Sequence, residues 1–418
     1  MRQIFFRILL LIGGVGYLGV LSVHSVGAWL LDHPTAENLQ RGIRWNSSNP
    51  SLWAAYARFQ LDPFEDSTAP PAAEAYLKAA TLNPFDPATW DGLVSAYLQM
   101  GEPAKAEATL RAALVAIPRS PYFAWRFANF LVQQGRAEEA LPYLRTAAAY
   151  QRSFRAPVFD ISWKLLADPE RILRDVVPSE TAVQADYLMF LLRTRRFAEA
   201  YPVWSRIRAD RYASFISLGN TYAERLAGAG MGQEAARVWD EILKDTDKSN
   251  LKPPGTLLTN GDFEYDLIGA GLGWRLSRDS GYLVSLDEFE SQQGTRSLRV
   301  TFDGSANPDF AGVRQWVPVT PNRRYRFAGY LKTENISSDS GLRFSVSSAA
   351  SPPEERFTYL TENRVGTMPW VQEQVDFKTG PNTQVILITL RRIPSRKLNN
   401  LLQGKVWMDH LSLTMQPQ

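Results

Sequence analysis

The sequence predicts a multidomain α and β protein, in which stacked α-helical hairpins precede an antiparallel β-sandwich. Apolar residues recur every three or four positions through residues 32–248, the spacing of amphipathic helices. After residue 256 this spacing stops, and short segments of alternating apolar and polar residues begin. We therefore predict a linker at residues 249–256, a β-sandwich at residues 257–418 and a separate N-terminal segment at residues 1–31.

The N-terminal segment is predicted to be a transmembrane helix. Residues 8–31 are apolar apart from small polar residues and His24, and the run is long enough to cross a bilayer. Arg2 and Arg7 precede it, which places the rest of the chain outside the cytoplasm, on the periplasmic or cell-surface side. The alternative is a cleaved signal peptide with small residues at positions 25–27. We favour a retained anchor because the run is longer than a signal-peptide core.

The composition excludes several kinds of site. The chain has 0 cysteines, which rules out disulfides, thiolate catalysis, thiolate metal sites and a lipoprotein anchor. Its three histidines are too few and too scattered for a zinc site or a Ser-His-Asp triad; they are His24, His33 and His410. A net charge of +3 gives no electrostatic footprint for nucleic acid, so we expect no nucleic-acid partner.

The hairpin at residues 87–118 carries the clearest repeat pattern. Its apolar residues form two helical blocks that Gly101 separates, and the small Ala106 and Ala113 let the paired helices approach each other. Proline recurs with a period of 34 residues, at Pro50, Pro84 and Pro118. The period and the residue order resemble the tetratricopeptide repeat (TPR) family.

This resemblance implies a TPR-like α-solenoid of four or five helical pairs. The register lapses at residues 154–178 and returns at residues 187–242. Such repeats stack because one pair cannot bury its own apolar face, and stacking creates a concave groove. We expect a protein partner in that groove, unless a segment such as the long loop at residues 62–71 fills it.

The C-terminal part contains several predicted strands. They are short, alternating or β-branched, and turns rich in Gly, Pro and Asn separate them; clear examples are residues 297–302, 325–331, 342–346 and 385–390. Many short strands at this spacing indicate an antiparallel β-sandwich.

A series of motifs gives this β-sandwich a family resemblance. In chain order they include Asn260-Gly261-Asp262-Phe263-Glu264, Gly273-Trp274, Gln315-Trp316-Val317-Pro318-Val319 and residues 404–413. The series resembles the jelly-roll carbohydrate-binding modules that accompany cellulases and xylanases, within the galactose-binding-like superfamily. The resemblance covers residues 257–414. We expect six aromatic residues to fill the core: Trp274, Tyr325, Phe327, Trp370, Phe377 and Trp407.

The resemblance also implies a structural calcium ion that ties the first strand to the last. The matching acidic positions are Asp262 or Glu264 at the start and Asp409 at the end. The alternative is that Asp262 caps a turn and Asp409 pairs with a nearby arginine. No other cofactor is implied.

Glycan sites in the resembled family combine aromatic faces with polar groups. Strand alternation points Tyr330 and Arg343 away from the core, and Tyr359 and Arg391 are further candidates. The alternative for most aromatic residues is a place in the core. A basic cluster, Arg391-Arg392 with Arg396-Lys397, fits an anionic polysaccharide or phospholipid headgroups, or is a solvated loop.

The sequence thus predicts a non-catalytic, membrane-anchored scaffold in envelope polysaccharide or exopolysaccharide assembly or export. The repeats hold a protein partner and the jelly roll holds glycan. A first alternative is an assembly adaptor whose sandwich binds protein or is purely structural. A weaker alternative is a glycan-active enzyme, although no segment resembles a hydrolase core and no phosphate-cradling glycine loop follows the strands.

Overall fold

A computed structural model describes residues 25–26, 28–62, 64–277, 279–348, 351–398 and 400–417. The chain divides into two compact units, residues 1–190 and residues 191–418. Most of the predicted transmembrane segment lies outside the described residues. Among the described residues, no helix combines the length and the apolar character that a membrane span requires.

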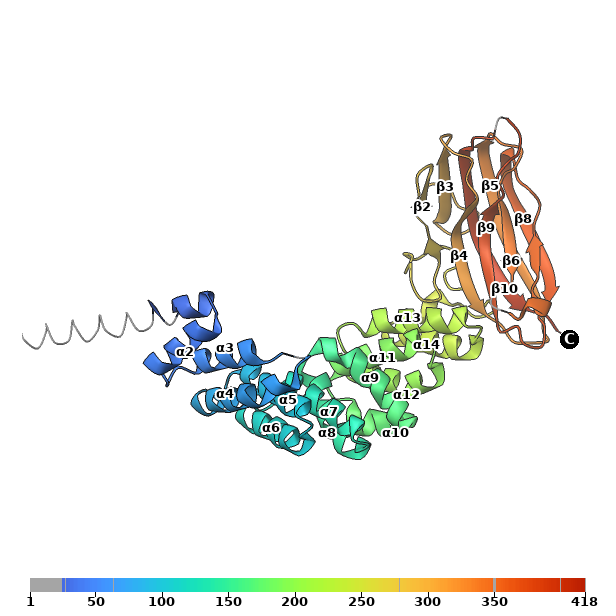
Figure 1. Cartoon of the computed structure of the whole chain (residues 1–418). Coiled ribbons are helices and arrows are strands. Elements are labelled where there is room, and N and C mark those ends of the chain that lie inside the picture. The colour runs from blue at the N-terminus through green and yellow to red at the C-terminus, as the bar shows by residue number, and fades with distance from the viewer. Residues whose placement is uncertain are drawn as a thin grey trace, which may run out of the picture. The chain divides into compact units, whose positions relative to one another are not determined.

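The first unit consists of helical hairpins (Figure 1). Its helices are α2 (Ala36–Trp45), α3 (Pro50–Gln60), η1 (Asp66–Thr68), α4 (Ala69–Leu82), α5 (Pro87–Gln99), α6 (Pro103–Ala116), α7 (Pro121–Gln133), α8 (Ala137–Tyr150), α9 (Arg152–Leu166), α10 (Pro169–Arg171) and η2 (Ile172–Val176); α11 (Thr181–Arg193) begins in this unit and ends in the next. Side chains of Asn49, Asp86 and Ser120 cap the first helix of three successive hairpins. The sequence therefore fixes where these helices begin.

Glycine ends the first helix of two hairpins. Gly101 and Gly135 adopt left-handed φ angles of 68° and 73°. The residue after each glycine donates its backbone N–H to a carbonyl five residues earlier, for example Glu102 N to Tyr97 O at 2.9 Å. This Schellman arrangement satisfies the last carbonyls of the helix. Ala106 and Ala113 are fully buried, as the repeat pattern predicts. The predicted lapse in register corresponds to α9, the short α10 and the π-helical turn η2.

The second unit joins helices to the β-sandwich. Its helices are α12 (Phe197–Ala209), α13 (Phe215–Gly228), α14 (Gly232–Asp245) and η3 (Ser249–Leu251). The predicted linker is packed, not free: Leu251 is buried, and the Thr256 hydroxyl accepts the backbone N–H of Leu413 at 3.0 Å. The second unit therefore begins at residue 191, well before the predicted linker at residues 249–256.

The sandwich is built from two five-stranded antiparallel sheets. One has the order β1-β4-β9-β6-β7 and the other the order β2-β3-β10-β5-β8, so neighbours in each sheet are mostly distant in sequence. The strands are β1 (Arg275–Leu276), β2 (Tyr282–Asp287), β3 (Ser297–Asp303), β4 (Phe310–Pro318), β5 (Arg324–Ile336), β6 (Arg343–Ser347), β7 (Thr358–Leu360), β8 (Gly366–Lys378), β9 (Val385–Arg392) and β10 (Gln403–Met415); the turn η4 (Pro353–Glu355) precedes β7. Side chains from both sheets form one apolar core.

Five of the six aromatic residues predicted for the core are buried, but four of them belong to the apolar core between the sheets, namely Trp274, Tyr325, Phe327 and Phe377. Trp407 is buried on the outer side of its sheet, because its neighbours Val406 and Met408 point into the core, and its indole N–H donates to Asp287. Trp370 is not buried. Trp370 is half-buried and donates its indole N–H to Glu290 at 3.3 Å. It lies on β8, an edge strand of its sheet, next to Val371, which pairs with the buried Leu331. Because successive side chains alternate between faces, Trp370 points outward. The motif placed it in the strand but did not determine its face.

Candidate functional site

The outer face of the β1-β4-β9-β6-β7 sheet carries polar, basic and aromatic side chains. The register pairs Arg314 with Thr389 and Thr389 with Ser345, and it pairs Arg343 with Arg391. Their alternating neighbours belong to the buried core, so these side chains point away from it. We call this set the outer face; its members are Arg314, Trp316, Arg343, Ser345, Thr389 and Arg391.

Arg343 has an unmet hydrogen-bonding group on this face. Its Nη2 donates to Asn363 Oδ1 at 2.7 Å, but in the described part of the structure its Nε is buried without an acceptor. Burial, and secondarily the charge of Arg391, lower the pKa of the Arg343 guanidinium. Arg391 itself is held by Asp309 and by the carbonyl of Phe310. Because this Nε is buried, a ligand on the outer face would contact only the exposed part of the half-buried Arg343 side chain.

The other two predicted glycan residues lie elsewhere. Tyr330 is on β5 of the opposite sheet, half-buried, with its ring 6.1 Å from that of His410. Tyr359 is on the edge strand β7, where its ring lies tilted at 5.2 Å and 6.4 Å from the rings of Phe357 and Phe377. The structure brings Arg343 and Arg391 together and leaves Tyr330 and Tyr359 apart from them.

The predicted basic cluster is not one surface. Arg392 is fully buried within the sandwich, whereas Arg391 points to the outer face. Lys397 forms an ion pair with Asp339 at 3.2 Å, and Arg396 is exposed. Adjacent residues of a strand face opposite sides, which separates the first two arginines. Four basic residues close in sequence therefore have different environments.

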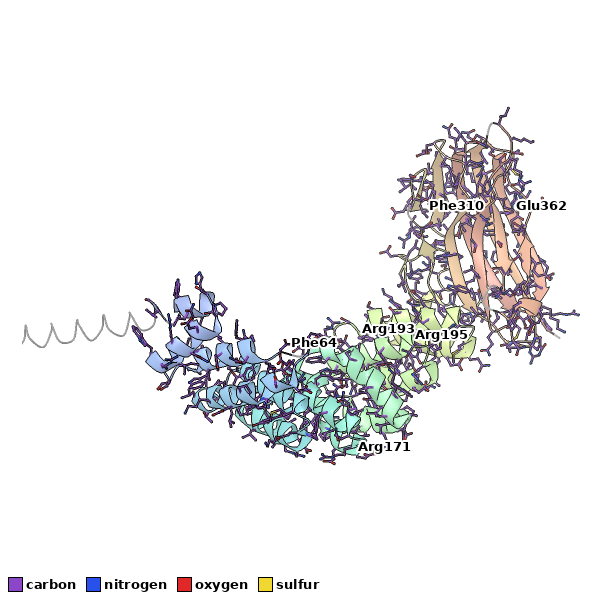
Figure 2. The ribbon with its side chains drawn as sticks, viewed as in Figure 1. Phe64, Arg171, Arg193, Arg195, Phe310 and Glu362 are labelled. Atoms are coloured by element: carbon purple, nitrogen blue, oxygen red, sulfur yellow. The ribbon has the colours of Figure 1, made fainter. Side chains whose placement is uncertain are left out.

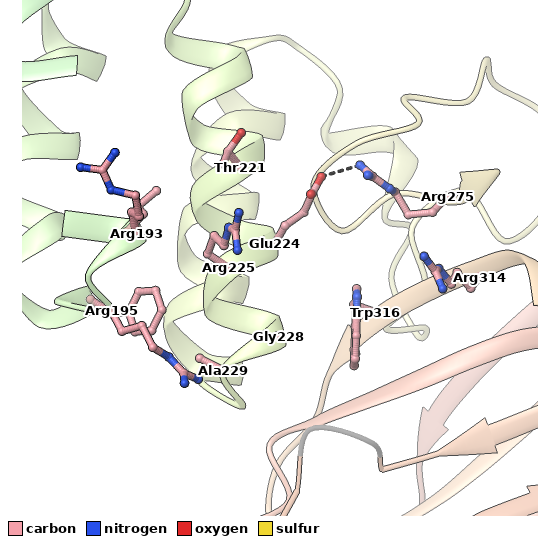
Figure 3. Close-up of a pocket in the computed structure, with 12 residues that line it drawn as sticks. Arg193, Arg195, Thr221, Glu224, Arg225, Gly228, Ala229, Arg275, Arg314 and Trp316 are labelled. Atoms are coloured by element: carbon pink, nitrogen blue, oxygen red, sulfur yellow. Dashed lines mark hydrogen bonds and ion pairs between the residues drawn. The ribbon is translucent and has the colours of Figure 1, made fainter. Parts of the chain in front are cut away.

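A cavity of about 600 Å³ lies where the helices of the second unit meet the sandwich (Figure 3). Figure 3 shows Arg275, Arg314 and Trp316 of the sandwich on one side of α13, and Arg193 and Arg195 on the other. Five arginines and a single acid, Glu224, are among its lining residues, so the cavity is strongly basic. It is lined by Leu192, Arg193, Arg195, Phe197, Thr221, Glu224, Arg225, Gly228, Ala229, Arg275, Arg314 and Trp316.

Glu224 holds the two walls of this cavity together. From α13 its Oε1 accepts the backbone N–H of Gly271 at 2.7 Å and the Arg275 guanidinium at 2.6 Å. Gly271 has a φ of 63°, and a Cβ there would lie 2.2 Å from the ring of Trp239 on α14. Glycine is required at this approach, because a side chain would strain the backbone and overlap the indole. The cavity is thus fixed by packed elements rather than by a mobile loop.

Sequence reasoning did not find the cavity. It singled out Trp316 within a motif, but not Arg195, Glu224 or Arg314 as site residues. One signal was present in the repeats. Where Gly101 and Gly135 end the first helix of a hairpin, the corresponding residue after α11 is Arg195. Arg195 therefore occupies a left-handed position that favours glycine, and such a residue can indicate a functional turn.

The predicted calcium residues do not form a cluster of free carboxylates. Asp409 is almost fully buried in β10, where its oxygens accept the backbone N–H groups of Gln292, Gln293 and His410. Burial raises the pKa of the Asp409 carboxyl, although these three hydrogen bonds oppose the rise. Among the described residues Asp409 forms no ion pair with an arginine; it anchors the loop that carries Gln292 and Gln293.

Glu264 is engaged in the same way. Its carboxylate accepts the backbone N–H and hydroxyl of Thr295 at 2.8 Å and 2.6 Å and the N–H of Arg296 at 3.0 Å. Burial alone would raise its pKa, but these hydrogen bonds hold the pKa below its usual value. Among the described residues no three acidic or histidine side chains gather closely enough to hold a metal ion. Backbone donors engage Glu264 and Asp409, so these two carboxylates do not fit a calcium site of free carboxylates.

Thermal unfolding tests whether a calcium ion binds to this end of the sandwich. Because backbone donors already occupy Glu264 and Asp409, we expect the same unfolding midpoint of the full chain in excess calcium and in EDTA. An ion that binds only the folded state would raise the midpoint with its concentration. A rise with calcium that magnesium does not reproduce would show that the ion binds, with carbonyl oxygens as further ligands.

Comparisons with known proteins found solved structures that are similar to parts of the chain. No protein-family model matches the sequence, and no curated protein matches it. The C-terminal part is similar to the CBM22-1 xylan-binding domain of Paenibacillus barcinonensis Xyn10C, with 18% identity, a TM-score of 0.28, and coverage of 37% of this chain and 91% of that one. The chain is also similar to YrrB, a TPR protein with an unusual peptide-binding site, with 15% identity, a TM-score of 0.25, and coverage of 51% and 94%.

A third similar structure is the enzymatically active domain of tailspike protein 4 of bacteriophage CBA120. It shares 10% identity at a TM-score of 0.28, over 39% of this chain and 22% of that one.

The helical hairpins and the two-sheet sandwich confirm the predicted combination of a TPR-like helical region and a jelly-roll-like domain.

Proposed function

We propose that this chain is a non-catalytic binding protein whose sandwich binds glycan through the outer face. The half-exposed guanidinium of Arg343, paired across the strands with Arg391 on that face, carries the proposal. A charged guanidinium can donate hydrogen bonds to sugar hydroxyls or carboxylates. Trp316 supplies an aromatic ring on the same face, which suits the apolar side of a sugar ring. Together they provide the two kinds of contact that a glycan site needs.

We propose that the helical repeats hold a protein partner. The first unit exposes large apolar side chains, among them Phe64, which is 97% exposed and is marked in Figure 2. The loop that carries Phe64 is tied to α5, because Gln99 donates its amide to Asp62 O at 2.6 Å. An exposed aromatic ring on a fixed loop supports a contact with a partner rather than with the chain itself.

We propose further that the chain is anchored in a membrane and exported, with a role in envelope polysaccharide assembly or export. The apolar run at residues 8–31 behind Arg2 and Arg7 supports the anchor and its orientation. A binding module for glycan on such an anchor would act outside the cytoplasm. Protease protection of the C-terminal part in intact cells, lost after the outer barrier is opened, tests this location.

The proposal that the chain is not an enzyme is supported by the acids of the cavity. Of the described residues that line it, Glu224 alone is acidic, and it is already paired with Arg275. Most glycosidases need a pair of carboxylates, one on each side of the scissile bond. Incubation of the full chain with each glycan that it binds, followed by product analysis, tests the proposal; released sugars would contradict it.

Substitutions on the two sheets test the glycan proposal. We expect Arg343→Ala to weaken glycan binding by the full chain about tenfold, the effect of losing one hydrogen bond from a charged group. Tyr330→Ala is the matched control, because it removes an outward side chain from the opposite sheet, and we expect unchanged affinity. A glycan array followed by calorimetry on each hit gives the comparison.

Two outcomes would redirect the proposal. If Tyr330→Ala weakens binding and Arg343→Ala does not, the glycan lies on the other sheet. If the folded protein binds no glycan at all, the chain is better explained as an assembly adaptor. The packing of the α13–α14 hairpin against the sandwich favours that alternative, because it covers part of the β1-β4 edge.

A further inference from the structure

The cavity beside the outer face has more positive charge than its own acid can neutralise. Glu224 pairs with Arg275, and among the described residues Arg195, Arg225 and Arg314 make no ion pair. These three arginines are exposed, so a ligand can reach their side chains. Guanidinium groups bind carboxylates in a planar, bidentate way, and several in one cavity favour a ligand with more than one negative charge.

The cavity is continuous with the outer face through strand β4. Arg314 and Trp316 line the cavity, and both are members of the outer face. From Arg314 the register leads across β9 and β6 through Thr389 and Ser345, beside Arg343 and Arg391. Thr389 and Ser345 are 5% and 7% exposed, so a ligand that extends from the cavity toward Arg343 would pass over the side chains around them. This arrangement suits an extended chain with repeated polar groups better than a single small anion.

The aromatic ring decides between a saccharide and a peptide. Trp316 is half-buried among the arginines and presents a ring to the cavity. A flat ring beside guanidinium groups matches a pyranose ring that bears a carboxylate. The side chains of an acidic peptide carry carboxylates but no ring that could stack on Trp316.

We propose that this cavity binds the carboxylate groups of an acidic, uronate-containing polysaccharide. The inference rests on the proposed glycan function of the outer face and specifies its ligand class. Arg195 and Arg314 contact carboxylates from the helical and the sandwich side. Trp316 stacks on the sugar, and Glu224 positions Arg275 and the adjoining loop without contacting the ligand.

The turn after α11 supplies a variant that separates binding from folding. Arg195 has a left-handed φ of 60°, and the N–H of Arg196 donates to Leu191 O at 2.8 Å, as in the turns that contain Gly101 and Gly135. Glycine is the favoured residue in this conformation. Arg195→Gly therefore removes a guanidinium from the cavity without straining the backbone. We expect its thermal midpoint to be unchanged or higher.

The chain also offers a matched control for this variant. Arg211 follows α12 with a left-handed φ of 45°, and its turn has the same pattern, with Tyr212 N donating to Ile207 O. Arg211 is exposed and is not among the residues that line the cavity. Arg211→Gly makes the same chemical change at the same kind of position. Any general effect of losing one positive charge or gaining one glycine appears in both variants.

The experiment measures binding of the full chain to oligomers of galacturonate, alginate and hyaluronan, each beside its carboxyl-reduced neutral form. We expect at least one acidic oligomer to bind about tenfold or more tightly than its reduced form, and the difference to shrink as salt rises. Arg195→Gly and Arg314→Gln should each weaken that binding about tenfold, whereas Arg211→Gly should not. Polyglutamate serves as the peptide probe and should bind more weakly.

The outcomes distinguish this inference from the proposed function. Equal binding of acidic and reduced oligomers, with loss only in Arg343→Ala, would overturn the inference and leave the glycan function intact. Tighter binding of polyglutamate than of any oligomer would overturn it in favour of an acidic peptide. No binding of any saccharide by the folded chain would overturn both proposals. Equal losses in Arg195→Gly and Arg211→Gly would assign the effect to net charge and also overturn the cavity site.

Discussion

Replacing Arg392 with methionine is expected to lower the free energy of unfolding of the second unit by about 3–5 kcal/mol, the cost of removing a charged partner from a buried hydrogen-bond network. The Arg392 side chain is 0% exposed. It donates to four oxygen atoms, Ser340 O at 2.8 Å, Pro308 O at 2.7 Å, Ser338 Oγ at 3.1 Å and Asn400 O at 3.2 Å. The substitution leaves these acceptors, of which Ser338 Oγ is buried and the three carbonyls are half-buried, without this donor.

The physical reason lies in how this arginine is solvated. Burial lowers the pKa of the Arg392 guanidinium, and the nearby Asp339 and Asp309 oppose that change. Carbonyl oxygens of three loops replace the water that the charge has lost. Methionine retains most of the apolar stem but none of the donors, so the loops at that end of the sandwich lose their common anchor.

Urea unfolding followed by tryptophan fluorescence measures the effect on the second unit. Arg396→Met is the control, because Arg396 is exposed and lies only four residues further along the chain. We expect the control to change the free energy of unfolding by less than about 0.5 kcal/mol. Equal effects of the two substitutions would contradict the view that Arg392 ties the loops together.

Replacing Trp239 with alanine is expected to cost about 3–5 kcal/mol and to loosen the helices from the sandwich. Trp239 is 1% exposed on α14, and its indole N–H donates to the Thr259 hydroxyl of the sandwich at 3.1 Å. Its ring also packs against Gly271, in the loop that Glu224 holds. Alanine removes both the hydrogen bond and the surface on which the loop rests.

Loss of this contact should also affect the cavity. The lining residues come from the α11–α13 region and from β1 and β4, so the cavity exists only while the helices and the sandwich stay packed. We expect Trp239→Ala to increase proteolysis between residues 245 and 257 and to weaken binding of acidic oligomers. Trp239→Phe keeps most of the ring and loses the N–H, so it should cost only about 1–3 kcal/mol.

If Trp239→Ala unfolds with the same midpoint as the unsubstituted protein and resists proteolysis equally, the hairpin and the sandwich do not depend on each other. The boundary at residues 249–256 would then be a true linker, as the sequence suggested. If Trp239→Ala is destabilised as expected, a fragment that contains the sandwich should need α12–α14 to fold stably.

Much of the fold could be predicted because its signals are local. Gly101 and the capping residues Asn49, Asp86 and Ser120 act within one turn, so the helix boundaries follow from neighbouring residues. Alternation along β5 and β6 likewise identified buried side chains such as Phe327 and Phe344. Trp370 was assigned correctly to a strand but wrongly to the core, because the motif does not determine which side of the sheet a side chain faces.

The candidate site was less predictable because it depends on contacts between distant residues. Arg343 and Arg391 were found from the sequence, since each lies on a recognisable strand, and their pairing across β6 and β9 came only from the sheet order. Arg195 and Arg314 are far apart in sequence and meet at one cavity. No local sequence pattern predicts that these two residues lie at one cavity, because their proximity depends on which helix packs on which strand.

The sequence by itself determined the kinds of element, their order and many of their buried faces, because hydrophobic spacing, capping and turn residues act over a few positions. Only the tertiary structure decided that the last helical hairpin and the sandwich form one compact unit, with Trp239 on Gly271 and Glu224 on Arg275. That packing places charges from separate elements around one cavity. Burial and electrostatic pairing depend on three-dimensional neighbours, so the site could be identified only after the chain was folded.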